Sequence, residues 1–108
     1  MDRADRIAVV VRPLPPYFEW ARRVSDIALA DPARFERRTR VYLLPDYLGD
    51  DPAGLRDRLW ARVFRHELEE WEPDRGYWPT LSRERFDDWF EVEIQADVFD
   101  LTAELAPR

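Results

Sequence analysis

The chain lacks cysteine, lysine and asparagine altogether, and it contains a single histidine, His66. Without cysteine there is no disulfide and no thiol nucleophile, and without lysine there is no Schiff base and no phosphate-binding loop of the Walker type. One histidine and no cysteine also exclude a zinc site built on several nitrogen or sulfur ligands. The sequence therefore assigns no catalytic residue, and no cofactor is expected.

Long apolar runs are missing as well. No segment approaches the roughly 20 apolar residues that a membrane-spanning helix needs. The run Ile7–Val11 is too short for the core of a secretory signal. Together with the absence of cysteine, this pattern predicts a cytoplasmic protein with no membrane partner. The 108 residues predict one globular domain over residues 1–108, large enough to bury a core without disulfides or metals.

Charge is distributed unevenly along the chain, whose formal net charge is −6. Residues 1–65 contain 13 arginines and 10 acidic residues, whereas residues 66–108 contain 4 arginines and 13 acidic residues. The overall negative charge opposes binding to nucleic acid, so no nucleic-acid partner is expected. The positive and negative segments are expected to attract one another, within one chain or between chains.

The hydrophobic pattern predicts strands that alternate with helices. Asp51-Pro52 and Ser82 are typical of helix starts, and residues 91–97 alternate apolar and polar side chains as a half-exposed strand does. The expected elements are a strand at 6–12, a helix in the first half of 17–29, a short turn from 31 carrying Phe35, a strand at 41–44 stopped by Pro45, a helix at 52–71, a short helix after Ser82 and a strand at 91–97.

The order β-α-β-α-α-β predicts a small α/β (α+β) domain, in which helices pack on a three-stranded mixed sheet. The first two strands should be parallel, joined by a right-handed crossover, and the last strand antiparallel. The strand at 6–12 is apolar at successive positions, so both of its faces should be buried. The adjacent apolar pair Val98-Phe99 predicts a bulge or burial on both faces.

Aromatic side chains are dense, with five tryptophans in 108 residues. Most are expected in the core, since each ring hides a large area. A partner or ligand surface is the second interpretation for the aromatic region, because tryptophan and tyrosine dominate binding hot spots. Glu93 is expected to face an aromatic wall near Trp89, which would raise its pKa unless an arginine lies beside it. The candidate binding residues are Trp71, Tyr77, Trp78, Trp89 and Glu93.

A dense carboxylate group supports an alternative hypothesis, a small metal-assisted hydrolase. Carboxylates close together can bind magnesium or divide into acid and base roles. The ordinary interpretation of the same residues is a solvated helix end and strand face. His66 and Glu70 resemble part of a helical metalloprotease motif, but that motif needs histidine where Glu70 stands. The candidate metal ligands are Asp87, Asp88, Glu91 and Glu93.

Several motifs resemble a group of small uncharacterised bacterial proteins, and the likeness covers most of the chain. It implies no activity, because none is assigned to that group. The residues that carry it are Ala8-Val9-Val10, Val41-Tyr42-Leu43-Leu44-Pro45, Glu67-Leu68, Trp71, Asp74, Trp78-Pro79, Phe86, Trp89-Phe90, Val92-Glu93, Val98 and Asp100-Leu101.

These observations favour a non-enzymatic binding or regulatory protein whose partner is a protein or a small molecule. A homodimer is expected, because three strands and a few short helices can barely cover both faces of a sheet. Apolar surface would then remain open near Ile7–Val11 or around Tyr77-Trp78. A second copy is the commonest cover for such a surface.

Overall fold

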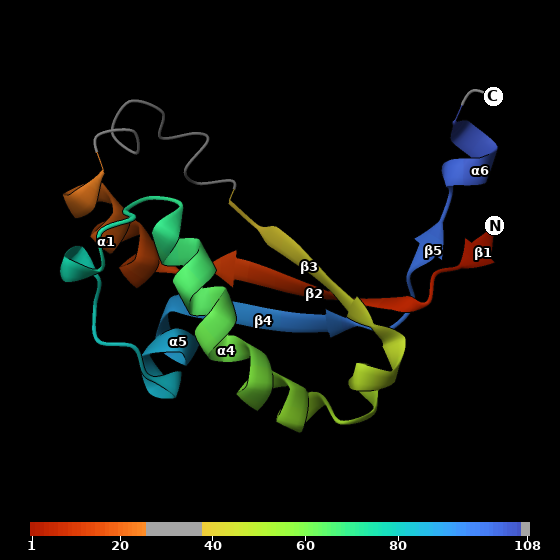
Figure 1. Ribbon diagram of the computed structural model, residues 1–108, viewed down its shortest axis with the longest axis horizontal. Coiled ribbons are helices and arrows are strands. Elements are labelled where there is room, and N and C mark those ends of the chain that lie inside the picture. The colour runs from red at the N-terminus through yellow and green to blue at the C-terminus, as the bar shows by residue number, and fades with distance from the viewer. Residues whose placement is uncertain (26–37, 107–108) are drawn as a thin grey trace.

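The computed structural model describes residues 1–25 and 38–106 of the chain. Its body is a three-stranded antiparallel sheet in the order β3-β2-β4, with helices packed on one face (Figure 1). The strands are β2 (Arg6–Pro13), β3 (Arg40–Pro45) and β4 (Phe90–Gln95), and the helices of the body are α1 (Pro15–Val24), α4 (Pro52–Glu69) and α5 (Arg83–Trp89). Two short 3-10 turns, η1 (Asp46–Asp50) and η2 (Arg75–Tyr77), flank α4.

The predicted α+β class and the antiparallel last strand are confirmed, but the predicted parallel pairing of the first two strands is wrong. The register pairs Ile7 with Leu44 and Val11 with Arg40, so β3 runs against β2 and the sheet is not mixed. The chain leaves β2 at Pro13 and re-enters the sheet at Arg40, which pairs with Val11. The end of β2 and the start of β3 therefore lie at the same end of the sheet, and the connection makes no crossover.

The two faces of the sheet differ in their cover. Ile7, Val9 and Val11 point toward the helices and are at most 2% exposed. On the opposite face Val41 and Leu43 are 59% and 61% exposed. Ala8 and Val10 of β2 are only half-buried on that face, so the expectation that the first strand is buried on both faces is wrong. The described helices of the body all lie on the other side of the sheet.

Helix α4 is the central support of the core. Its N-cap is Asp51, whose side chain accepts a hydrogen bond from the Gly54 amide at 3.1 Å, and Pro52 follows as predicted. Helix α5 starts at the predicted cap, where the Ser82 hydroxyl accepts from the Arg85 amide at 3.0 Å. The buried side chains of α4 are Leu55, Leu59, Val63, Phe64, Glu67 and Leu68.

Both chain ends form a projecting unit that was not expected, which we call the terminal arm (residues 1–5 and 96–106). Strands β1 (Asp2–Arg3) and β5 (Phe99–Asp100) pair antiparallel, and α6 (Thr102–Leu105) follows (Figure 1). Phe99 is 55% exposed, so the expected burial of both faces at Val98-Phe99 is wrong. Among the described helices none is long and apolar enough to cross a membrane. The predicted turn at 31–35 and the continuation of the first helix beyond residue 25 lie outside the described residues.

Candidate functional site

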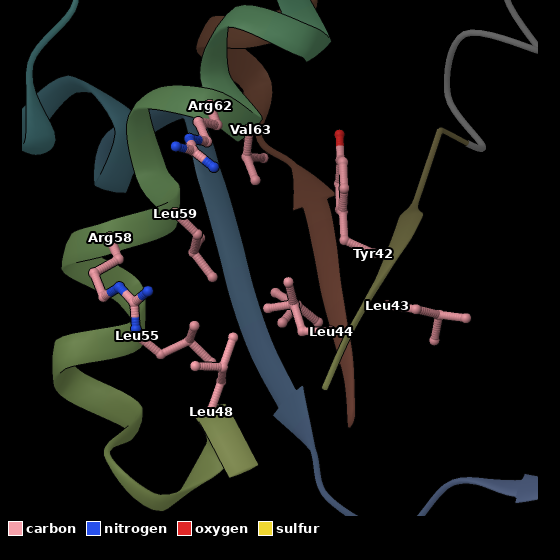
Figure 2. A pocket seen from close by; sticks show the side chains of 10 residues that line it. Tyr42, Leu43, Leu44, Leu48, Leu55, Arg58, Leu59, Arg62 and Val63 are labelled. Carbon is pink, nitrogen blue, oxygen red and sulfur yellow. The ribbon is translucent and has the colours of Figure 1, made fainter. Parts of the chain in front are cut away.

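An apolar cavity lies between the edge strand β3 and helix α4 (Figure 2), and we call it the β3–α4 groove. Its volume of about 470 Å³ falls within the range of about 300–1,000 Å³ that is typical of ligand sites. Figure 2 shows Leu43 pointing away from the cavity, so it is the strand's backbone that borders the groove there. The lining residues are Val9, Tyr42, Leu43, Leu44, Leu48, Leu55, Arg58, Leu59, Arg62 and Val63.

Two arginines of α4 line this apolar groove. Arg58 and Arg62 are one helical turn apart, so both lie on the same side of the helix (Figure 2). Neither guanidinium has an ion pair or hydrogen bond within residues 1–25 and 38–106. The groove therefore combines apolar walls with two positive charges that no described carboxylate neutralises.

The strand beside the groove forms an edge of the sheet within residues 1–25 and 38–106. Strand β3 pairs only with β2 among the described strands, and its side chains on the uncovered face are apolar, Val41 and Leu43. The opposite edge, β4, carries Glu91 and Glu93 on that face, and charged edges resist pairing with another strand. Of the two edges, β3 is the one suited to accept an added strand.

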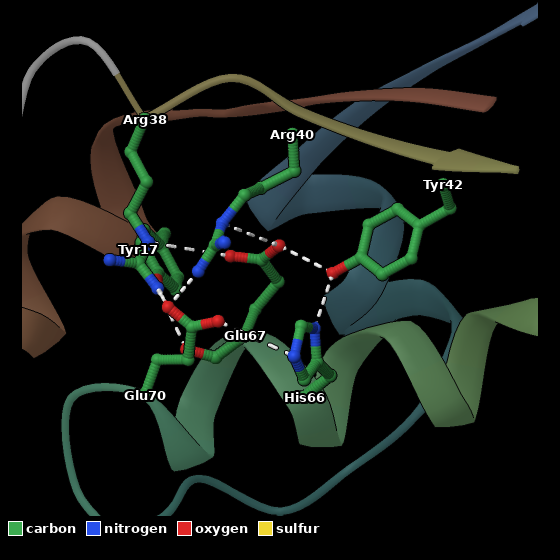
Figure 3. Close-up of polar contacts among 7 residues, drawn as sticks. All are labelled: Tyr17, Arg38, Arg40, Tyr42, His66, Glu67 and Glu70. Carbon is green, nitrogen blue, oxygen red and sulfur yellow. Dashed lines mark hydrogen bonds and ion pairs between the residues drawn. The ribbon is translucent and has the colours of Figure 1, made fainter. Parts of the chain in front are cut away.

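A partly buried polar network adjoins the groove at Tyr42 (Figure 3). Glu67 of α4 is fully buried, and Tyr42 of β3 donates a hydrogen bond to its Oε1 at 2.6 Å. The Nε atoms of Arg38 and Arg40 lie 3.6 and 3.7 Å from the two carboxylate oxygens of Glu67. Both arginines also form ion pairs with Glu70, one turn further along α4.

The tyrosine hydroxyls of this network are held in their neutral form. Burial raises the pKa of Tyr42, and the hydrogen bond to Glu67 raises it further. Burial likewise raises the pKa of Tyr17, whose hydroxyl donates to the Glu67 carbonyl oxygen at 3.0 Å. The Tyr42 hydroxyl also lies 2.8 Å from Nδ1 of His66, so it contacts two residues of α4.

The charges of the network balance one another. Two guanidinium groups, Arg38 and Arg40, face two carboxylates, Glu67 and Glu70, and Arg38 also stacks over the Trp71 ring at 4.6 Å. A neutral Tyr42 is a poor nucleophile. The network therefore ties β3 to α4 and shapes the groove, and the groove itself offers the open binding surface.

The aromatic residues proposed from the sequence are divided between core and surface. Trp71 and Trp89 are buried, and Trp89 packs against Tyr17 and Phe64 in the core. Trp78 is half-buried and donates to the Glu72 carbonyl, whereas Tyr77 is 63% exposed. The structure does not gather these side chains into one surface.

Glu93 lies away from the aromatic side chains, contrary to the expectation. In β4 its neighbours Val92 and Ile94 pack against the core, so Glu93 points to the uncovered face of the sheet. There it pairs with Arg12 at 2.9 Å and accepts a hydrogen bond from Gln95. Side chains alternate between the two faces of a strand, so Glu93 lies on the opposite face from Val92. The expectation relied instead on the closeness of Trp89 in the sequence.

The acidic residues proposed as metal ligands do not converge on a site. Asp87 pairs with Arg83 at 3.2 Å, Asp88 and Glu91 are exposed, and Glu93 pairs with Arg12. Within the described parts of the chain, no group of three or more histidine and carboxylate side chains is placed to hold a metal ion. The geometry thus lends the hydrolase alternative no support.

Comparisons with protein families, with curated proteins and with solved structures find no match to this chain. The site must therefore be interpreted from its own geometry. Sequence reasoning missed its main residues, Arg58, Arg62, Tyr42 and Glu67. One signal was present in the sequence. Arg58 and Arg62 lie at the border of the apolar stripe of the helix, where an arginine can cover apolar surface with its stem and keep its charged head in water.

Proposed function

We propose that the chain is a non-enzymatic binding module that holds an extended polypeptide segment in the β3–α4 groove. The face of the segment that lies in the groove would carry both apolar and acidic side chains. The observation that carries this proposal is the placement of Arg58 and Arg62, unpaired within the described residues, beside a leucine-lined cavity of about 470 Å³. Burying apolar surface would supply affinity, and the arginines would select for acidic side chains.

The edge strand supports a polypeptide rather than a small molecule as the occupant. An extended segment added to β3 would satisfy the strand's outer backbone groups, a common mode of peptide recognition. Alternate side chains of an added strand would then point into the groove, toward Leu44, Leu48 and Leu59. The same set of side chains faces Arg58 and Arg62, so acidic residues belong in it beside the apolar ones, and the opposite set would lie on the outer side of the added strand.

Titration of a fluorescent synthetic peptide tests the proposal. The probe carries leucine and aspartate in turn at every second position, with threonine between them, so that both lie on one face of a strand. Its anisotropy is followed at low protein concentration and low salt. Arg62→Glu is expected to raise the dissociation constant about tenfold, because it replaces an attractive charge with a repulsive one. Arg23→Glu, at an exposed arginine of α1, makes the same change in net charge away from the groove and is expected to leave the constant unchanged.

Three results would contradict the proposal. One is an equal loss of affinity in both variants, and another is equal binding of a peptide with lysine in place of aspartate. The third is binding of dodecanoate without binding of the peptide, which would make the groove a small-molecule site.

A further inference from the structure

We infer that the segment held in the β3–α4 groove is the terminal arm of a second copy of this chain, so that two copies exchange arms. The inference rests on the function proposed above and names the partner of that same site. The two surfaces that would meet each lack a partner within the described residues. The β3–α4 groove is apolar and basic, and the terminal arm is apolar and acidic.

The terminal arm exposes apolar side chains that it cannot bury alone. Phe99 is 55% exposed, Leu101 40% and Leu105 75%, and Met1 at the other chain end is 67% exposed. The β1–β5 ladder has two residues in each strand, and α6 has four residues. Isolated two-stranded ladders are marginally stable in water, so a further surface is needed to cover these side chains.

Charge on the arm complements the groove. Asp2 lies directly opposite Asp100 in the β1–β5 ladder, and like charges at such positions repel each other. Neither carboxylate has an ion pair within the described residues, although nearby Asp97 pairs with Arg3 and Glu104 with the Met1 amino group. These two aspartates are suited to meet the two unpaired arginines of the groove.

The alternation of the arm also suits the groove. Arg3 and Phe99 share one face of the ladder, whereas Asp2 and Asp100 share the other. The groove has an apolar wall at β3 and η1, and both of its arginines come from the α4 wall. An arm lying between the walls therefore presents Phe99, beside the ion-paired Arg3, to one wall and the two aspartates to the other.

The terminal arm of one chain would bind the groove of another copy, because it lies away from the groove of its own chain. In Figure 1 it projects beyond the end of the sheet and away from α4, so it does not fold back onto its own groove. A two-fold exchange fills both grooves at once and leaves no open end for further growth. The positive and negative segments of the chain would meet across this interface.

A charge swap at the two exposed sites tests the contact by sedimentation equilibrium. Arg62→Glu alone and Asp2→Arg alone are each expected to weaken the dimer about tenfold, because each brings like charges together. Both substitutions in one chain restore opposite charges and should return the dissociation constant close to that of the wild type. Asp2 is exposed, and it has no ion pair or side-chain hydrogen bond within the described residues, so its replacement leaves folding intact.

Cysteine crosslinking locates the interface, since the chain has no thiol of its own. Oxidation of the double variant Leu48→Cys/Phe99→Cys is expected to give covalent dimers of twice the 13.0 kDa chain mass, whereas either single variant should remain uncrosslinked. Crosslinking of Val41→Cys alone would place the uncovered sheet face at the interface and overturn the inference. A monomeric mass throughout, or failure of the charge swap to restore the dimer, would also overturn it. Binding of the acidic peptide by such a monomer would leave the proposed function standing.

Discussion

At the scale of single residues, Glu67 carries the largest electrostatic cost in the described part of the chain. A fully buried carboxylate loses its hydration, and this loss is tolerable only when cations and donors replace water. Arg38, Arg40 and Tyr42 of the β3 segment provide that replacement. The network therefore fixes the distance between β3 and α4, and with it the width of the groove.

Glu67→Gln is expected to lower the free energy of unfolding by about 3 kcal/mol, because it removes the buried carboxylate charge that faces Arg38 and Arg40. The loss lies at the lower end of the range for broken buried pairs, since Glu70 still neutralises part of the charge. Urea unfolding measures it. Glu69→Gln, at an exposed neighbour on the same helix, is the control, and equal midpoints for the two variants would contradict the account.

Stability is expected to fall as the pH rises above about 10, where tyrosines of the unfolded chain ionise. The pKa values of Tyr17 and Tyr42 are raised in the folded state, so the native protein retains protons that the unfolded chain releases. For each proton that the folded chain retains and the unfolded chain releases, the free energy of unfolding falls by about 1.4 kcal/mol per pH unit. The chain has no lysine, so the alkaline range is free of lysine titration.

Tyr42→Phe separates the two contributions. It should lower stability at neutral pH, because Glu67 loses its hydrogen-bond donor, and it should roughly halve the slope of stability against pH above about 10. Urea unfolding at a series of pH values measures both effects. A slope equal to that of the wild type would show that Tyr42 ionises as easily when folded as when unfolded.

The sequence contained part of this network but not its assembly. Arg38, Arg40 and Tyr42 recur at the spacing of one strand face, and Glu67 and Glu70 lie one turn apart on a helix. Nothing in either pattern shows that Tyr42 and Glu67, 25 residues apart, touch each other. That contact follows from the pairing of β3 with β2, because this pairing places β3, and with it Tyr42, beside α4.

At the scale of elements, helix starts were the most predictable features. The Asp51-Pro52 and Ser82 signals act through bonds within one turn, so they were visible in sequence and are confirmed by the hydrogen bonds to Gly54 and Arg85. The β1–β5 ladder was missed because two-residue strands show no periodicity. Its pairing joins the two ends of the chain, which no local pattern reports.

Asp51→Ala is expected to destabilise the protein by about 1 kcal/mol, because the Gly54 amide at the start of α4 loses its acceptor. The cap is exposed, so water replaces part of the bond and the effect stays modest. Thermal unfolding compares this variant with Asp50→Ala, which changes a neighbouring exposed carboxylate that makes no such bond. Equal midpoints for the two variants would show that the cap contributes nothing.

At the scale of the whole molecule, the protein is less compact than a typical domain, because helices cover only one face of the sheet and the terminal arm projects from it. The radius of gyration is 16.1 Å, against about 13 Å expected for a compact domain of this length. The small number of strands and helices predicted open apolar surface near Ile7–Val11 or around Tyr77-Trp78. In the structure Tyr77 is exposed, but the exposed apolar side chains of the sheet are Val41 and Leu43 of β3, while Ile7, Val9 and Val11 are buried. The direction of β3 was beyond prediction, because it depends on where the chain re-enters the sheet.

Nuclear magnetic resonance of the labelled chain with the acidic peptide tests the central claim most directly, because it locates the bound segment residue by residue. The proposal predicts that backbone amide shifts change at Leu44, Leu48, Leu59 and Arg62, on the two walls of the groove. It also predicts weaker changes as salt is added, since exposed guanidinium groups are screened. Shift changes confined to Ala8 and Val10 of the central strand β2, or to Tyr77 and Trp78, would contradict it.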